Sequence, residues 1–206
     1  MSFKIAILAS TQGTDLQAII DSVSSGELAG VAEIKCVITD RECFAAERAK
    51  QQGIETFVLD KGKFASREEF DKEVAQVLDE RGVQLVCLAG YMRILSTFFV
   101  QKFAGRIINV HPSLLPSFPG GMDKNVHQLV IDSGVKVTGC TFHFVDETVD
   151  GGAIIAQQAV VVLDDDTSSA LKERVQQAEK KLYPMIIKMF AQGKLKVDGK
   201  KVWLLE

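Results

Sequence analysis

The chain has 206 residues, of which 47% are hydrophobic and 25% charged, and 24 basic against 27 acidic side chains leave a formal net charge of −3. This composition excludes a disordered chain, collagen and a coiled coil, and the length predicts one domain over residues 1–206. Because the chain is mildly acidic and has no long basic block, it lacks the positive surface that nucleic-acid binding requires.

The first half of the chain alternates apolar runs of strand length with amphipathic stretches of helical period. The last of these strands is almost continuously apolar, as a strand covered on both faces should be. We therefore predict an α/β fold, with a doubly wound, mostly parallel sheet and helices on both faces. In chain order the elements are strand 3–9, helix 14–25, strand 32–39, helix 42–52, strand 56–59, helix 67–81 and strand 84–89.

The second half predicts a fifth parallel strand and then a change of strand direction. A loop that holds three of the chain's four prolines follows the fifth strand. Two later runs rich in β-branched residues predict an antiparallel C-terminal strand pair, so the sheet is expected to be mixed. In chain order the elements are helix 96–103, strand 106–110, helix 123–133, strands 136–145 and 153–162, helix 167–190 and a hairpin at 194–205 that turns over Asp198-Gly199.

The sequence also bears on location and metal content. No apolar run reaches the roughly 20 residues that cross a bilayer, and the N-terminus lacks the pattern of a signal peptide, so we expect a cytoplasmic protein without membrane contact. The cysteines form no C-x-x-C pair, and the three histidines are not at helical i, i+4 spacing. These spacings predict no metal site and no disulfide, with mostly buried, reduced thiols at Cys36, Cys43, Cys87 and Cys140.

The turn after the first strand is a candidate anion site. It places Gly13, several hydroxyl groups and a helix N-terminus at the carboxyl edge of the predicted sheet. Free N–H groups and the helix dipole attract a phosphate there, and a glycine lets the backbone approach it. Thr14 and Gln17 could instead form a capping box that needs no ligand. The residues alone leave both interpretations open.

Three polar residues are candidates for catalysis. Asn109 and His111 lie at the end of the fifth predicted strand, where alternation turns both side chains the same way. An Asn amide can donate a hydrogen bond to an oxyanion, and a His can move a proton near neutral pH. Asp150, followed by two glycines, could orient an imidazole and stabilise its charged form, although Asp before Gly is also a common turn residue. Nothing local in the sequence brings Asp150 to His111.

Several motifs carry a resemblance to a known family. Residues 108–120 read INVHPSLLPSFPG, which closely resembles the formyltransferase signature N-[IV]-H-P-S-L-L-P-x-[FY]-x-G. Further matches are AGYMRIL at 89–95, HFVDE at 143–147 with DGG at 150–152, and YP at 183–184. The similarity runs from residue 4 to about residue 190. The chain is identified as a member of the phosphoribosylglycinamide formyltransferase family, the folate-dependent enzymes of purine synthesis.

The resemblance implies a formyltransferase fold and transfer of a formyl group from the cosubstrate 10-formyltetrahydrofolate to the amine of glycinamide ribonucleotide, without a metal. Asn109, His111 and Asp150 match the family's catalytic triad. The positions that match the ribonucleotide site are Gly13, Thr14, Asp15, Gln176 and Glu179. The positions that match the folate site are Arg67, Met92, Arg93, Ile94, Leu95, Asn109, Asp146 and Asp150.

The sequence departs from the family in two places. The family's usual phosphate turn reads G-x-G-S-N, whereas Thr11, Thr14 and Asp15 replace its first glycine, its serine and its asparagine. A carboxylate would repel the phosphate unless Asp15 contributes only its backbone N–H. Residues 121–127 also lack the family's more familiar histidine-bearing sequence.

Other functions stay open beside formyl transfer. A 10-formyltetrahydrofolate hydrolase passes the same group to water, but normally carries an extra N-terminal domain, and we expect none before Phe3. A transfer-RNA formyltransferase normally needs a C-terminal domain and a basic surface. A non-catalytic folate or nucleotide sensor could keep the same fold. The residues do not predict the oligomeric state.

Overall fold

The computed structural model describes residues 2–120 and 125–205. Residues 121–124 lie outside the described part, and with them the start of the helix that the sequence predicts at 123–133. The elements are β1 (Phe3–Ala9), α1 (Thr14–Ser25), β2 (Ala32–Thr39), α2 (Phe44–Gln51), β3 (Thr56–Val58), the 3-10 helix η1 (Lys61–Lys63), α3 (Arg67–Glu80), β4 (Leu85–Leu88), α4 (Thr97–Lys102), β5 (Ile107–His111), α5 (Val126–Asp132), β6 (Val137–Phe144), β7 (Ile154–Val161), α6 (Ser168–Ala191), β8 (Leu195–Asp198) and β9 (Lys201–Leu204).

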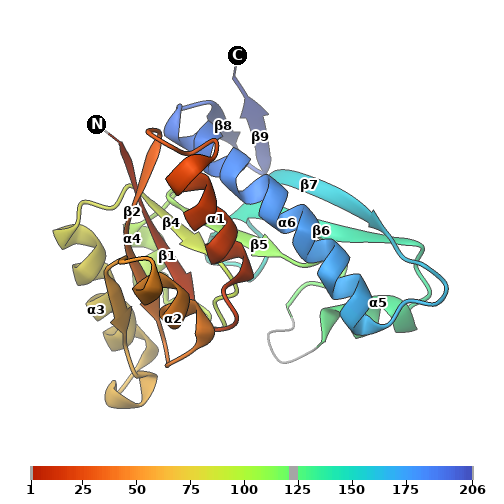
Figure 1. Ribbon diagram of the computed structural model, residues 1–206, viewed down its shortest axis with the longest axis horizontal. Helices are drawn as coiled ribbons and strands as arrows, with labels where there is room; N and C mark the ends of the chain where they lie inside the picture. The colour runs from red at the N-terminus through yellow and green to blue at the C-terminus, as the bar shows by residue number, and fades with distance from the viewer. Residues whose placement is uncertain (1, 121–124, 206) are drawn as a thin grey trace.

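Seven strands form one mixed sheet in the order β3-β2-β1-β4-β5-β6-β7 (Figure 1). The pairs up to β5 are parallel, whereas β6 pairs antiparallel with both β5 and β7. The predicted doubly wound sheet with an antiparallel C-terminal pair is therefore confirmed. The chain leaves β1 toward β2 on one side and later returns to β4 on the other. The strand order therefore reverses at the carboxyl ends of β1 and β4, the point where sheets of this kind bind ligands.

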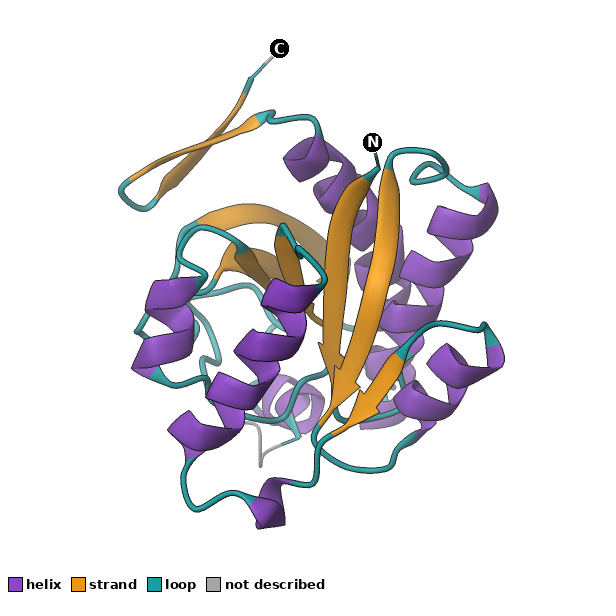
Figure 2. Ribbon diagram, turned by 90° about the vertical axis from the view of Figure 1, so that its left-hand side faces the viewer, coloured by secondary structure: helices purple, strands orange, loops and turns teal. Residues whose placement is uncertain are grey.

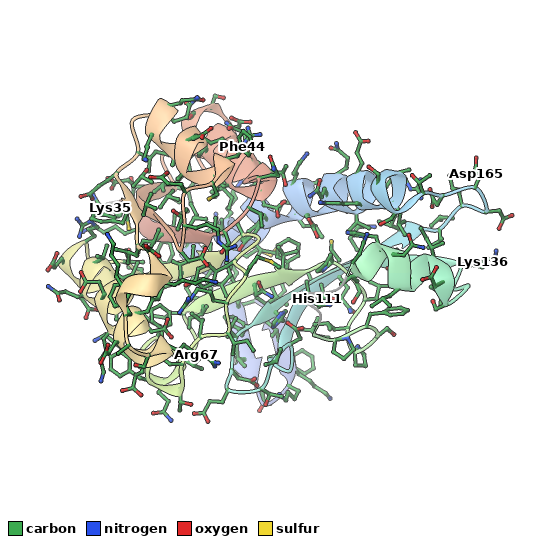
Figure 3. The ribbon with its side chains drawn as sticks, turned by 90° about the horizontal axis from the view of Figure 1, so that it is seen from below. Lys35, Phe44, Arg67, His111, Lys136 and Asp165 are labelled. Atoms are coloured by element: carbon green, nitrogen blue, oxygen red, sulfur yellow. The ribbon has the colours of Figure 1, made fainter. Side chains whose placement is uncertain are left out.

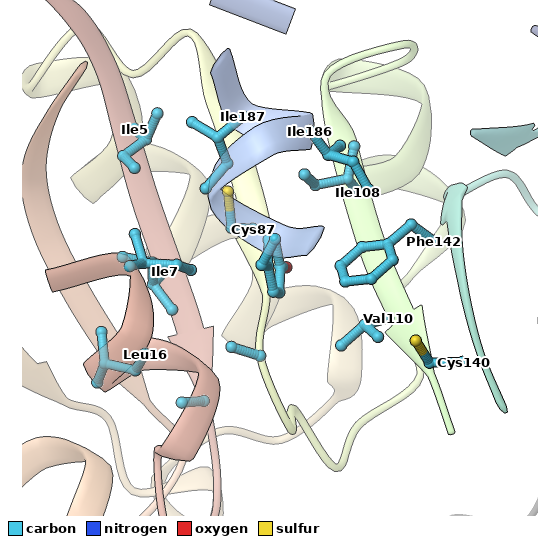
Figure 4. Close-up of a cluster of buried hydrophobic side chains, with 14 of the residues drawn as sticks. Ile5, Ile7, Leu16, Cys87, Ile108, Val110, Cys140, Phe142, Ile186 and Ile187 are labelled. Carbon is cyan, nitrogen blue, oxygen red and sulfur yellow. The ribbon is translucent and has the colours of Figure 1, made fainter. Parts of the chain in front are cut away.

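Alternating side chains of the strands build two cores, one on each face of the sheet. Ile5 and Ile7 of β1 belong to the core under α1, α2, α5 and α6, whereas Ala6 and Leu8 belong to the core under α3 and α4. Figure 2 shows helices on both sides of the strands, and Figure 4 shows the first core between β1, β4, β5 and α6. Helices therefore cover both faces, as the near-continuous apolar strands predicted.

Loops, rather than a helix, cover part of the second face. Ile108 and Val110 of β5 enter the first core, so Asn109 and His111 point to the opposite face. There the loop after β5 packs on β6, because the buried Thr141 hydroxyl donates to Ser113 O at 2.7 Å and accepts from Leu115 N at 2.9 Å. This loop-covered part of the sheet holds the polar side chains of the candidate site.

The observed helices and strands begin and end close to the predicted residues, with a few local differences. Helix α2 begins at Phe44 rather than Glu42, because Cys43 is extended and serves as its N-cap. The 3-10 helix η1 was not predicted; the side chain of Asp60 accepts a hydrogen bond from Gly62 N and starts it. The hairpin turns over Gly199-Lys200, one residue later than predicted. No described helix is long and apolar enough to cross a membrane.

Tyr183 joins α6 to the centre of the sheet. Its side chain is fully buried, and its hydroxyl donates a hydrogen bond to Leu88 O at 2.8 Å. Its ring meets Phe142 edge-on, with the ring centroids 5.0 Å apart. Because Leu88 ends β4, this contact also fixes the start of the segment that follows at the carboxyl edge of the sheet.

The substitution Tyr183→Phe should lower the free energy of unfolding by about 1 kcal/mol, because it leaves the buried Leu88 carbonyl without this donor while keeping the ring. Urea unfolding followed by circular dichroism measures the change. An unchanged midpoint with an unchanged slope would show that the hydroxyl contributes nothing to stability.

Candidate active site

Two loops meet at the carboxyl ends of β1 and β4. Ser10 follows the last residue of β1, and its backbone N–H donates to Gly90 O at 3.1 Å. Its hydroxyl accepts a hydrogen bond from Met92 N at 3.0 Å. The predicted phosphate turn after β1 is therefore held directly against the predicted folate segment after β4.

His111 lies near the middle of the molecule, between the labelled Lys35 and Asp165 at its two ends (Figure 3). The side chain is buried, with Nδ1 3.3 Å from Asp150 Oδ2 and Nε2 2.9 Å from the carbonyl oxygen of Phe118. Both ring nitrogens therefore face acceptors, and an imidazolium can donate at both ends. The fold thus brings together two residues that lie 39 positions apart in the chain.

Asp150 is held in a conformation that few non-glycine residues adopt. Its φ is 52°, in the left-handed region, and its Oδ2 accepts a hydrogen bond from Gly120 N at 2.8 Å. The backbone lies very close to β6 here, since a Cβ on Gly152 would lie 1.7 Å from Phe144 O. Asp150 is thus a turn residue, as its sequence context predicted, and its carboxylate also reaches His111. Backbone strain of this kind is common at functional sites.

Asn109 meets a histidine that the residue-by-residue analysis did not single out. His143 lies opposite Asn109 in the β5–β6 register, and its Nε2 is 3.1 Å from Asn109 Nδ2. His143 Nδ1 is 2.9 Å from Phe144 O, so Nδ1 carries the proton and Nε2 accepts from the Asn109 amide. Burial lowers the pKa of His143 below its ordinary value, which favours this neutral form.

His143 therefore fixes which way the Asn109 amide points. One N–H of Asn109 is used by His143, and the other makes no hydrogen bond with the residues that the structure describes, so it can serve a ligand. His143 Nε2 is also 3.7 Å from Asp150 Oδ1, so the two histidines flank one carboxylate. The only sequence signal for His143 was its place in the HFVDE motif, because the strand register that pairs it with Asn109 is not visible in the sequence.

The turn after β1 presents uncapped amides. Gly13 is the N-cap of α1 with a φ of 68°, and among the described residues no side chain caps the helix. A Cβ on Gly13 would lie 2.8 Å from Ala45 Cα, so only glycine fits. The alternative capping box is wrong: Thr14 is already helical, and the Gln17 side chain contacts Asp21 and Arg48 instead.

Arg48 of α2 supports this turn, and the sequence did not predict this contact. Its Nε donates to Gln12 O at 2.8 Å, and Nη1 donates to Gln17 Oε1 at 3.2 Å. A cation therefore lies beside the free amides of the helix N-terminus, and both features attract an anion.

Asp15 turns its carboxyl group away from the open side of the turn and into the protein. Its residue is only 7% exposed, and Oδ1 has no hydrogen-bond partner among the described residues. Burial raises the pKa of Asp15 to about 6, while Lys180 lowers it in part. Burial also raises the pKa of Glu179 well above its ordinary value, and Asp15 adds to this shift. The structure thus places Asp15 near Glu179 of α6, and Gln176 lies half-buried one turn earlier.

The candidate folate residues lie in the segment after β4, at the start of α3 and in the loop after β6. Met92 and Ile94 are partly exposed, whereas Leu95 is buried. The Arg93 guanidinium stacks 4.1 Å above the Phe70 ring, so it packs on α3. The other candidates are Arg67, exposed at the first residue of α3, and Asp146, whose carboxylate pairs with Lys200. Among the described residues no group of three or more His, Cys, Asp or Glu side chains could hold a metal ion.

Replacing Asp15 with asparagine should stabilise the protein at neutral pH but not in acid. The folded-state pKa of about 6 exceeds the ordinary value of 3.8, so the folded protein binds this proton more tightly than the unfolded chain. The contribution of Asp15 to wild-type stability therefore falls as pH rises from about 4 to 6, whereas asparagine stays neutral throughout. Urea unfolding at pH 8 should show a gain on the order of 2 kcal/mol that vanishes near pH 4. The exposed Asp21→Asn on the same helix is the control; an equal gain there would contradict the explanation.

Comparisons with known proteins show the family of the chain. The formyl transferase family matches residues 3–187. The phosphoribosylglycinamide formyltransferase of Haemophilus influenzae is 41% identical over 98% of this chain and 93% of its own length. The trifunctional purine biosynthetic protein adenosine-3 of Gallus gallus is 47% identical over 97% of this chain, which spans only 20% of that protein.

A solved structure shows the same fold. The glycinamide ribonucleotide transformylase 1 of Symbiobacterium toebii superimposes with a TM-score of 0.95 at 41% identity, covering 100% of this chain and 95% of that one. The chain therefore belongs to the formyl transferase family, and within it to the phosphoribosylglycinamide formyltransferases.

Proposed function

We propose that this protein transfers the formyl group of 10-formyltetrahydrofolate to the primary amine of glycinamide ribonucleotide. The observation that carries the proposal is the convergence of His111, Asp150 and the oriented Asn109 amide on one face of the sheet. The names of its relatives in both comparisons support formyl transfer and the ribonucleotide acceptor.

The proposed chemistry is a direct attack of the amine nitrogen on the formyl carbon. The new C–N bond pushes the carbonyl electrons onto oxygen, and the free N–H of Asn109 donates to this oxyanion. The bond between the formyl carbon and the folate nitrogen then breaks as the C=O bond re-forms, and the departing nitrogen gains a proton for which His111 is the proposed donor. The attacking nitrogen loses a proton, which restores the proton that His111 gave. Asp150 holds His111 in place and compensates its charge. No step requires redox chemistry or a metal.

The proposed ribonucleotide site extends from the phosphate turn to α6. The phosphate would accept hydrogen bonds from the amides at Gly13, Thr14 and Asp15, with Arg48 adding positive charge. Because the Asp15 side chain is buried, its backbone N–H can serve the phosphate without presenting a carboxylate to it. Gln176 and Glu179 would contact the rest of the ribonucleotide, so that binding energy from remote groups positions the amine.

The proposed folate site lies on the other side of the reacting atoms. Arg67, the Met92–Leu95 segment and the loop from Asp146 to Asp150 would bind the folate next to Asn109. We place the reaction in the cytoplasm, a proposal that the four unpaired cysteines support; three of them are buried and Cys43 is half-buried.

One assay tests the function. Purified protein with 10-formyltetrahydrofolate should formylate glycinamide ribonucleotide and release little formate. Formate release without transfer would identify a hydrolase instead. Folate binding with neither product would identify a sensor.

His111→Ala and Asp150→Asn should each slow turnover by about a hundredfold or more, because each removes part of the proton-transfer and charge-stabilising machinery. Steady-state kcat measures this loss, and substrate binding should change little. A His111→Ala enzyme that works at full speed would remove the mechanism from consideration.

Gly13→Val should raise the KM for glycinamide ribonucleotide far more than the KM for the folate. The valine Cβ would meet Ala45 Cα at 2.8 Å, and the φ of 68° is strained for a β-branched residue, so the turn must move. Parallel titrations of the two substrates measure the split. Equal effects on both KM values would argue that the turn does not hold the phosphate.

A further inference from the structure

The hairpin of β8 and β9 follows α6 and lies after residues 3–187, which the formyl transferase family matches. Leu195 and Val202 anchor it, since both pack against the first core, and β9 contacts β7 (Figure 1). Its tight turn over Gly199-Lys200 begins with a φ of 59° at Gly199, a backbone conformation that suits glycine. The turn therefore holds Lys200 at a defined place beside the β6–β7 connection.

Lys200 reaches the loop that carries Asp150, here called the Asp150 loop (residues 146–152). Its ammonium donates a hydrogen bond to Asp146 Oδ2 at 3.0 Å and a second one to the carbonyl oxygen of Gly151. These acceptors lie four residues before Asp150 and one residue after it. One side chain from the hairpin thus bridges both ends of the loop.

The Asp150 loop is organised around the same carboxylate. Asp146 Oδ1 accepts from Thr148 N at 2.8 Å while Oδ2 faces Lys200, and Gly151 N donates to Thr148 O at 3.1 Å. Against the effect of burial, Lys200 and the Thr148 amide keep the pKa of Asp146 below its ordinary value, so the carboxylate is charged at neutral pH. The ammonium therefore completes a ring of contacts from Asp146 through Thr148 to Gly151.

We propose that Lys200 is a positioning residue for formyl transfer, which ties the two ends of the Asp150 loop together and so holds the Asp150 carboxylate against His111. The inference rests on the proposed function, because it assigns Lys200 a role through Asp150. An exposed ion pair contributes little to global stability, so the tether should affect geometry rather than folding. Small displacements of a catalytic group lower turnover steeply, but Gly120 N also holds Asp150, so we expect a partial loss.

Kinetics of three variants test the positioning role. Lys200→Ala should lower kcat by about three- to tenfold, with little change in the KM for the ribonucleotide or in melting temperature. Lys200→Arg keeps a cationic donor and should restore most of kcat. Lys201→Ala removes the neighbouring exposed lysine, whose ammonium makes no ion pair with the described residues, and should behave like the wild type.

Hydrogen exchange of the free protein tests the tether without using activity. A peptide that spans the Asp150 loop contains the Thr148 and Gly151 amides, which are both hydrogen-bonded in the ring. Exchange in this peptide should be faster in Lys200→Ala than in the wild type, Lys200→Arg or Lys201→Ala. If the wild type transfers no formyl group, the proposed function fails, and the exchange result still decides whether the tether exists.

The proposal requires both a lower kcat and faster exchange in the Lys200→Ala variant when the wild type is active. Faster exchange with unchanged kcat would show that the tether does not position Asp150, and lower kcat with unchanged exchange would show that Lys200 does not hold the loop. A rise in the folate KM alone, with unchanged exchange, would mean that the ammonium contacts the folate. Each of these results would overturn the proposal.

Discussion

The two-residue alternation of β5 decides where the chemistry of this protein can occur. Ile108 and Val110 enter the apolar core, and this burial obliges Asn109 and His111 to face the other side of the sheet. A slip of one residue in the register would place the polar pair in the core and the apolar pair at the site. Hydrophobic burial on one face therefore positions the polar groups on the other.

The face that receives Asn109 and His111 differs from the rest of the sheet because loops cover it. A helix would bring a row of apolar side chains, whereas the loops bring backbone carbonyls, amides and the Asp150 carboxylate. Phe118 O and Asp150 meet the two nitrogens of His111, and His143 meets Asn109, so each of these polar side chains has a partner. Pairing of this kind is what makes burial of polar groups tolerable, and it also orients them.

The fold removes a conflict between charge and ligand at the proposed ribonucleotide site. Asp15 stands where the family has asparagine, and a carboxylate near a phosphate would oppose binding. The fold buries this side chain near Glu179, and desolvation then favours the protonated forms. No side chain among the described residues caps the helix amides of the turn, and the acidic side chain is withdrawn, so the departure changes the interior more than the proposed anion site.

The sequence by itself determined the architecture and the chemical types of the site. Periodicity predicted the alternating strands and helices, because burial on one or two faces leaves a direct pattern in consecutive residues. The signature around Asn109 and His111 resembled that of formyltransferases, and the turn at Gly13 left an anion site and a capping box open, since both are local motifs. The family match confirmed the resemblance over most of the chain.

Only the tertiary structure decided which residues act together. The pairing of His111 with Asp150, of Asn109 with His143 and of Lys200 with the Asp150 loop joins residues from different elements. None of these contacts leaves a local pattern, because strand register and loop placement follow from the packing of the whole chain. The same reason applies to Asp15. The sequence shows an acidic residue in the turn, but burial is a property of the fold, and burial raises the pKa of this carboxyl group.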